Sequence, residues 1–224
     1  MTVSAEVKLL DQNTANQIAA GEVVEKPASV VKELVENALD AGAGKIDVTI
    51  FEGGTQYIRV ADDGSGMTEA NAKLAVLRHA TSKIRAAEDL MSLHTLGFRG
   101  EALPSIASVS NFQLLTRPAD EEFATSIRID GGEQTECQQT GGQAGTTVIV
   151  ENLFFNVPAR RKFLRTNATE GRYINELLTR LALSRPDVRF KLVSNDKEVL
   201  STPGNGSLFD AITALYGKKL VTNF

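Results

Sequence analysis

The apolar residues of this sequence change their spacing abruptly at Gly42. Between Pro27 and Gly42 they recur every three or four positions, which predicts an amphipathic helix with Ser29 as its N-cap and Gly42 as its end. From 46 to 60, apolar and polar residues alternate around a Gly53-Gly54 pair, which predicts an antiparallel hairpin. The predicted buried face of the helix consists of Val30, Val31, Leu34, Val35, Ala38 and Leu39.

Strand and helix patterns continue to about residue 200. Further strand-like runs are centred on Leu114, Ile127, Glu136 and Val148. A long amphipathic helix is predicted around 173–181, and a last hairpin over 188–193 and 198–200. The stretch from 68 to 100 is helical in parts but rich in Ala, Ser, Thr and Gly, which indicates a mobile cover.

The ends of the chain differ from its middle. Residues 1–20 are predicted to form an N-terminal arm that passes into a short helix and a turn at Gly21. Residues 201–207 hold one Pro and two Gly, which is typical of a linker, and 208–216 has the pattern of one helix. We therefore predict a main domain over 1–203 and the start of a second, truncated domain over 204–224.

Composition excludes several classes of site. Cys137 is the sole cysteine and His79 and His94 are the only histidines, so a disulfide, a thiolate metal cluster or a His-based triad is not expected. No run of 18 apolar residues and no signal-peptide pattern occurs, which predicts an intracellular protein without a membrane span. Because the net charge is −4, any DNA contact must come from a local basic patch.

The first strong helix carries a polar stripe opposite its apolar face. Glu33, Glu36, Asn37 and Asp40 fall within an arc of roughly 100°, with no basic residue among them. Like charges at these spacings destabilise a helix slightly, so helix stability does not explain them. They suit a Mg²⁺ ligand and a general base. A solvated acidic face is the commoner explanation of such a stripe taken alone.

A carboxylate and two glycines end the first hairpin. Asp62 has the same parity as Ile58 and Val60, so its side chain is predicted to face the core, while Asp63 faces away. Gly64 and Gly66 allow close approach of a ligand to the backbone. The group can accept a hydrogen bond from an exocyclic amine such as that of adenine. A hairpin turn with an Asx cap is the structural alternative.

The string from Gly97 to Leu103 enters another predicted helix, which continues through Ile106 and Val109. Pro104 is tolerated there because first-turn amides have no partner within the helix. Those free amides, with Arg99 beside them, can donate hydrogen bonds to phosphate oxygens, so the string is predicted to bind phosphates. An ordinary glycine N-cap explains the loop equally well when it is considered alone.

Other polar strings allow a functional and a structural interpretation. Thr81-Ser82-Lys83 can donate to phosphates or form a solvated turn, and 145–147 opens a strand. The basic run of Arg160, Arg161, Lys162 and Arg165 can touch nucleic acid or be a solvated helix surface. The two histidines have no acidic or thiol partner at catalytic spacing and are interpreted as structural.

Four motifs occur in a fixed order: ELVENALDAG (33–42), DDGSG (62–66), GFRGEAL (97–103) and GTT (145–147). This order resembles the GHKL ATPase family shared by type II topoisomerases, one class of heat-shock chaperones, histidine kinases and MutL. The strings 16–43, RHATSKI (78–84) and LFFNVPARRKFL (153–164) resemble the MutL branch, whose members act in DNA mismatch repair. The resemblance covers about 10–200.

The resemblance implies a fold and a site. The fold is α+β, a two-layer α/β sandwich with a mixed, mainly antiparallel sheet backed by helices, of the Bergerat type. Glu33 is implied as the catalytic base that activates water, Asn37 as the Mg²⁺ ligand, and 68–100 as the ATP lid. The implied ATP-binding residues are Asn37, Asp62, Gly64, Gly66, Met67, Thr81, Ser82, Lys83, Gly97, Phe98, Arg99, Gly100, Glu101, Ala102, Leu103 and Thr147.

The resemblance also implies partners and a cellular place. ATP would drive dimerisation of the full-length protein, which would work with a mismatch-recognition protein, a downstream helicase or nuclease, and DNA in the bacterial cytoplasm. The family takes a phosphate-binding Lys from its second domain, and Lys218 and Lys219 lie too early for that role. The alternatives are an ATP-binding scaffold or clamp without turnover, or a topoisomerase- or chaperone-type ATPase.

Overall fold

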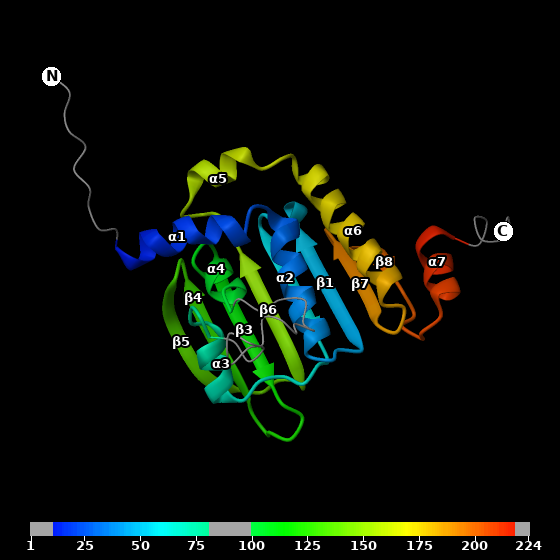
Figure 1. Ribbon diagram of the computed structural model, residues 1–224, viewed down its shortest axis with the longest axis horizontal. Coiled ribbons are helices and arrows are strands. Elements are labelled where there is room, and N and C mark those ends of the chain that lie inside the picture. The colour runs from blue at the N-terminus through cyan, green and yellow to red at the C-terminus, as the bar shows by residue number, and fades with distance from the viewer. Residues whose placement is uncertain (1–10, 81–99, 218–224) are drawn as a thin grey trace, which may run out of the picture.

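A single sheet organises the chain in a computed structural model, which describes residues 11–80 and 100–217 (Figure 1). The strands are β1 (Lys45–Phe51), β2 (Tyr57–Asp62), β3 (Asn111–Arg117), β4 (Ala124–Asp130), β5 (Glu133–Thr140), β6 (Gly145–Glu151), β7 (Arg189–Ser194) and β8 (Lys197–Ser201). Their order across the sheet is β5-β4-β3-β6-β2-β1-β7-β8. Only the β1–β7 pair is parallel among these neighbours, so the sheet is mixed and mainly antiparallel.

Helices form a second layer over this sheet (Figure 1). They are α1 (Gln12–Val23), α2 (Pro27–Asp40), α3 (Glu69–Ala75), α4 (Ala102–Ala107), α5 (Pro158–Phe163), α6 (Asn167–Ser184) and α7 (Leu208–Tyr216), with a 3-10 turn η1 (Glu52–Gly54). Val31 of α2, Leu178 of α6 and Ile46 of β1 are fully buried between the layers. The predicted α+β sandwich is therefore confirmed.

The ends of α2 follow from its sequence, although the predicted N-cap is wrong. The helix begins at Pro27, two residues before Ser29, and Lys26 is its N-cap without a side-chain hydrogen bond. Proline suits a first helical position because its φ is already helical and its missing N–H would have no partner there. At the other end, the Gly42 amide donates to the Leu39 carbonyl (3.0 Å) and the Ala43 amide to the Ala38 carbonyl (3.1 Å). This Schellman arrangement confirms the predicted stop.

The strand pattern agrees with the sequence. All four runs centred on 114, 127, 136 and 148 are strands, and the two hairpins are β1–β2 and β7–β8. At the first hairpin Gly54 has a φ of 86°, and a Cβ there would lie 2.9 Å from Pro27 Cβ and 3.2 Å from Ile174 Cδ1. The turn therefore needs glycine both for its backbone angle and for its contact with α2 and α6.

The segment after β8 is hydrogen-bonded to the sheet. The Thr202 amide donates to the Phe190 carbonyl (2.9 Å), the Phe190 amide donates to the Thr202 hydroxyl (3.0 Å), and the Gly206 amide donates to the Pro186 carbonyl (2.9 Å). The predicted helix at 208–216 is confirmed as α7, which contacts α6 and β8. The division into a main domain and the start of a second one stays a prediction.

Two sequence expectations need adjustment. Helix α1 runs through Gly21 to Val23, so Gly21 lies inside a helix and not at a turn. Helix α4 ends at Ala107, before Val109.

Within residues 11–80 and 100–217, the helices are all too short or too polar to span a bilayer.

Candidate functional site

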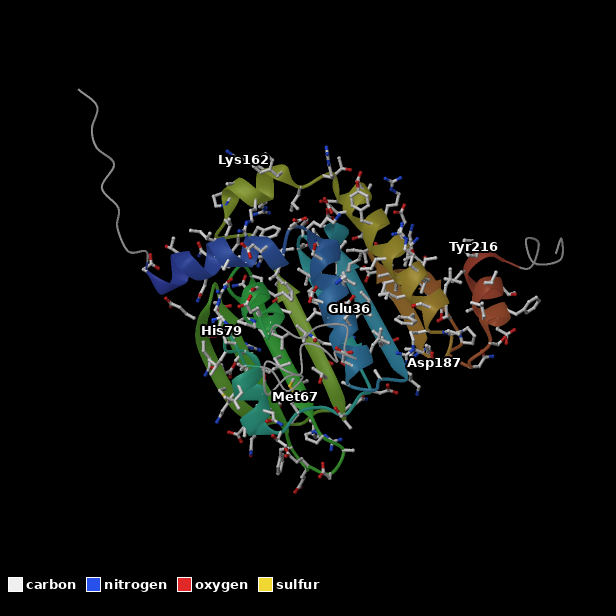
Figure 2. All side chains as sticks on the ribbon, in the orientation of Figure 1. Glu36, Met67, His79, Lys162, Asp187 and Tyr216 are labelled. Atoms are coloured by element: carbon white, nitrogen blue, oxygen red, sulfur yellow. The ribbon has the colours of Figure 1, made fainter. Side chains whose placement is uncertain are left out.

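The polar stripe of α2 lies on the side of the helix away from its buried face. Glu33, Glu36, Asn37 and Asp40 are all half-buried, whereas their apolar neighbours are buried. Figure 2 shows Glu36 on α2, in front of the sheet. Helix α2 contacts both β2 and α4, so the helix that carries the stripe is adjacent to the elements that carry the two other predicted parts of the site.

A basic residue joins this stripe, contrary to the expectation from the sequence. The Lys32 ammonium lies 3.0 Å from Glu36 Oε2 and 3.3 Å from Glu33 Oε1. Burial disfavours the charged ammonium, but the hydrogen bond to Glu36 and the two negative charges outweigh it and raise the pKa of Lys32. The position of Lys32 outside the predicted arc did not exclude contact, because its side chain is long enough to reach round the helix.

Asp62 ends β2 with its side chain half-buried, as its parity predicts, and Asp63 is exposed. Burial raises the pKa of the Asp62 carboxyl above its ordinary value, while hydrogen bonds from the backbone amides of Gly64 and Thr146 act in the opposite direction. The Gly64 amide lies 2.9 Å from Asp62 Oδ1. Asp63 instead accepts from the Gly44 and Lys45 amides and thereby ties the end of β2 to the start of β1. Asp63 is therefore occupied by a backbone contact, and Asp62 stays the predicted site carboxylate of the two.

The two glycines after Asp62 fit against the protein's own backbone. A Cβ on Gly64 would lie 3.0 Å from the Ala41 carbonyl oxygen, at the end of α2. Gly66 has a φ of 65°, and a Cβ there would lie 2.2 Å from the carbonyl oxygen of Arg117, at the end of β3. The glycines thus hold the loop between α2 and β3, which places Asp62 beside the end of α2. Their predicted contact with a ligand stays a prediction.

The two threonines of GTT lie on opposite faces of β6. Thr146 is the Cα partner of Asp62, whereas Thr147 is the partner of Ala61. The resemblance implies Thr147 as an ATP-binding residue, but its side chain points to the face of the sheet opposite Asp62. Thr146 occupies that place. Its parity with buried Val148 was the sequence signal that could have identified it.

The GFRGEAL string is described only from Gly100 onwards. Gly100 has a φ of 62°, Glu101 is the N-cap of α4, and Ala102 and Leu103 form its first turn. Pro104 lies in that turn, as predicted. The predicted site residues Thr81, Ser82, Lys83, Gly97, Phe98 and Arg99 lie outside the described residues.

A histidine interpreted as structural contacts this string. His79 Nδ1 lies 3.2 Å from Glu101 Oε1. His79 therefore has an acidic partner in the fold, although the sequence shows none at catalytic spacing. The two residues are far apart in sequence, so their spacing gave no sign of the contact.

The oxygen atoms on α2 suit a magnesium ion that is held partly by a nucleotide and water. They do not form a metal site made of protein ligands alone. Within residues 11–80 and 100–217, no group of three His, Cys, Asp or Glu side chains has the arrangement of a metal site. Magnesium in nucleotide sites is held by one or two protein oxygens together with phosphates and water. An amide oxygen from half-buried Asn37, beside Glu33 and Glu36, fits that pattern.

Three residues of the basic run lie on α5, at the outer edge of the helix layer, where Figure 2 shows Lys162, and Arg165 follows the helix. Arg160 has a structural partner, because its Nη2 donates to the carbonyls of Gln17 (2.9 Å) and Ile18 (3.2 Å) on α1. The other basic residues are exposed, as is Phe163, with 86% of its surface accessible. The exposed part of the run therefore consists of Arg161, Lys162 and Arg165.

Residues 25–144 match the family model described as histidine kinase-, DNA gyrase B-, and HSP90-like ATPase. A DNA mismatch repair protein MutL of Symbiobacterium thermophilum is 57% identical, over 96% of this chain and 34% of that protein. The corresponding protein of Desulforudis audaxviator is 56% identical, over 95% and 38%. A solved Aquifex aeolicus MutL ATPase domain complexed with ADP aligns with a TM-score of 0.69 and 36% identity, over 87% of this chain and 70% of that one. The chain spans about a third of the length of the curated relatives.

Proposed function

This chain belongs to the MutL family of DNA mismatch repair proteins, with their histidine kinase-, DNA gyrase B- and HSP90-like ATPase domain, and we propose that it binds ATP with Mg²⁺ as a switch. In this proposal nucleotide binding favours one conformation of the full-length protein, and hydrolysis returns it to the other. The solved relative complexed with ADP supports nucleotide binding on this fold.

The observation that carries the proposal is the position of Asp62 beside the end of α2. The Ser65 amide donates to the Ala41 carbonyl at 3.0 Å, and Gly64 packs against the same residue. Because α2 also contacts α4, the half-buried carboxylate, the polar stripe and the first turn of α4 come from adjacent elements. An acceptor for a base, oxygen ligands for a cation and free amides for phosphates are the three groups that a Mg-nucleotide needs.

Each group has a separate role in the proposal. Glu33 removes the proton from the attacking water, and Asn37 supplies a protein oxygen to Mg²⁺. Asp62 accepts a hydrogen bond from the adenine amine, and the backbone at 100–103 holds phosphates. When bound, Mg²⁺ neutralises charge on the phosphate oxygens.

The partners belong to the proposal as well. ATP binding promotes dimerisation of the N-terminal domains, and the dimer couples a mismatch-recognition protein to a downstream helicase or nuclease. The exposed Arg161, Lys162 and Arg165 contribute to weak DNA binding, since they can neutralise phosphates. This work takes place in the bacterial cytoplasm, on DNA.

The decisive variant is Glu33→Ala in the full-length protein. Loss of a general base lowers turnover by roughly 10²- to 10⁴-fold, while nucleotide binding should stay close to wild type because base and phosphate contacts remain. Turnover is measured by phosphate release and binding by calorimetric titration with the Mg²⁺ complex of a non-hydrolysable ATP analogue.

Glu36→Ala is the matched control, because Glu36 lies on the same face and shares Lys32 with Glu33. Its turnover should remain near that of the wild type. Equal losses in the two variants would show that the charge of the stripe matters and not the base. Full turnover in Glu33→Ala would contradict the assigned role.

A further inference from the structure

Four polar residues lie side by side across the sheet, one on each of β2, β6, β3 and β4. They are Asp62, Thr146, Thr116 and Thr125, and each is the Cα partner of the next. We call them the Asp62 row. Thr116 is 1% exposed and Thr125 is 3% exposed. Hydroxyl groups at such depth are costly unless they form hydrogen bonds, so their partners indicate what they do.

The hydroxyl of Thr116 has three neighbours. The Met67 amide lies 2.9 Å from its Oγ1, Thr146 Oγ1 lies 2.9 Å away, and the Gly145 carbonyl oxygen lies 3.3 Å away. The Met67 amide can only donate, so Thr116 accepts from it. Two acceptors compete for the single proton of Thr116, the Gly145 carbonyl at 3.3 Å and Thr146 Oγ1 at 2.9 Å, a pair in which either oxygen can donate. We assign the proton to Thr146, because only that distance lies in the usual range of a hydroxyl hydrogen bond.

This assignment fixes the direction of the Thr146 hydroxyl. Thr146 accepts from Thr116, so its own proton is available to a further acceptor. Thr146 is the partner of Asp62, and its backbone amide also donates to the Asp62 carboxyl. A donor hydroxyl beside an acceptor carboxylate complements adenine, which presents an amine donor beside ring-nitrogen acceptors.

Thr116 also anchors the segment that follows Asp62 in the sequence, through its hydrogen bond with the Met67 amide. Met67 follows the Gly64–Gly66 loop directly and packs against the core. Gly66 lies against the carbonyl of Arg117, the residue next to Thr116. One buried hydroxyl therefore contacts both segments that flank Asp62, although it lies on a strand outside all four sequence motifs.

We propose that Thr116 is a positioning residue for adenine recognition, because it orients the Thr146 hydroxyl and anchors Met67 on either side of Asp62. The inference rests on the proposed binding of ATP at Asp62. It assigns to β3 a part in nucleotide specificity that no motif in the sequence reveals.

Thr116→Val tests this with little change of shape, since a methyl group replaces the hydroxyl. The dissociation constant for the Mg²⁺ complex of a non-hydrolysable ATP analogue should rise about tenfold, the equivalent of one lost buried hydrogen bond. Thr116→Ser keeps the hydroxyl and should restore wild-type binding. Thr125→Val removes the next hydroxyl of the Asp62 row, which does not contact Thr146 or Met67 among the described bonds, and should bind normally.

Thr146→Val gives a second, independent variant, since it removes the acceptor of the Thr116 proton. It should weaken binding, and adding Thr116→Val should weaken it by much less than another tenfold step, because the two hydroxyls act as a unit. Additive losses would overturn the inference. Equal losses in Thr116→Val and Thr125→Val would also overturn it, because they would indicate general damage to the sheet.

Asp62→Asn separates this inference from the proposed function. If the wild type binds the analogue, Asp62→Asn does not, and Thr116→Val binds as tightly as the wild type, the role of Thr116 is wrong and the ATP site stands. If the wild type fails to bind, or Asp62→Asn binds normally, the proposed function fails. Unfolding temperatures of all variants show whether each one is folded.

Discussion

The burial of the Asp62 carboxyl has an electrostatic cost, beside the role in adenine binding that we propose for it. Its carboxyl is half-buried, and the burial that raises its pKa also disfavours its charged form in the folded domain. Because the folded-state pKa lies above the unfolded value, this group favours folding in acid, and the contribution is lost as pH rises through the folded pKa. Without nucleotide, the ionised carboxylate therefore lowers the stability of the domain.

Asp62→Asn should consequently change the pH dependence of unfolding. Relative to the wild type, the variant should gain stability as pH rises from below the ordinary aspartate pKa to neutrality, because it carries no charge to bury. The free energies of unfolding in urea, measured without nucleotide at several pH values, provide the check. The same variant should lose binding of the ATP analogue.

Asp196→Asn is a suitable control, since Asp196 is exposed in the β7–β8 turn, where its φ of 62° also suits asparagine. This control removes a carboxylate that is not buried, so comparison with it separates the effect of burial from the loss of one charge. A constant difference between Asp62→Asn and the wild type would mean that burial of Asp62 carries no charge penalty.

Single residues could be predicted only where local rules decide. Parity was sufficient to orient Asp62 and to separate it from Asp63. The contact between His79 and Glu101 and the reach of Lys32 depend on how elements pack and on side-chain length, which periodicity does not describe. Ser29 was misplaced as an N-cap because Pro27 was a stronger start signal.

Elements far apart in the sequence are joined by the contact between Arg160 of α5 and α1. A Cβ on Gly21 would lie 2.2 Å from Arg160 Nη2, so with a side chain at position 21 the guanidinium would have to shift from the place where it reaches the Gln17 and Ile18 carbonyls. Glycine inside a helix costs about 1 kcal/mol relative to alanine. A hydrogen bond from a charged donor stabilises the folded state by up to about 1.5–3 kcal/mol. The two bonds of Arg160 therefore offset the cost of the glycine.

Gly21→Ala should therefore destabilise the domain by about 1 kcal/mol, although helix propensity alone predicts a gain. In an Arg160→Ala background the same change should be neutral or stabilising, because the collision is gone. Urea unfolding of the four proteins of this double-mutant cycle measures both effects. The same sign in both backgrounds would show that the contact does not determine the preference for glycine.

Periodicity predicted the helices and strands well, since each one buries a regular apolar face. It did not predict their contacts. A glycine within a helical pattern was the only local sign of the Arg160 contact, and it was interpreted as a turn. Most of the predicted lid and part of GFRGEAL lie outside the described residues, so both stay predictions.

Nucleotide binding should alter the behaviour of the whole molecule. A ligand that binds only the folded state stabilises it by about 2.7 kcal/mol at a hundredfold excess over its dissociation constant. The Mg²⁺ complex of a non-hydrolysable ATP analogue should thus raise the unfolding temperature of the chain. It should also increase the sedimentation coefficient through dimerisation, to an extent that grows with protein concentration.

Asp62→Asn provides the control, since it should show neither response at the same analogue concentration. A rise in unfolding temperature without any change in sedimentation would support binding and contradict nucleotide-driven dimerisation of this chain. No response in the wild type would contradict both.

The strand order has a consequence for synthesis of the protein. Strands β1 and β2 are synthesised early, but their outer neighbours in the sheet are β7 and β6, which are encoded far downstream. The β1–β2 hairpin of a nascent chain therefore has two unpaired edges until β6 and β7 have been synthesised. Distant pairing of this kind slows folding and exposes unpaired backbone to aggregation. The end of β2 that carries Asp62 is therefore completed late, so the youngest chains cannot yet capture nucleotide.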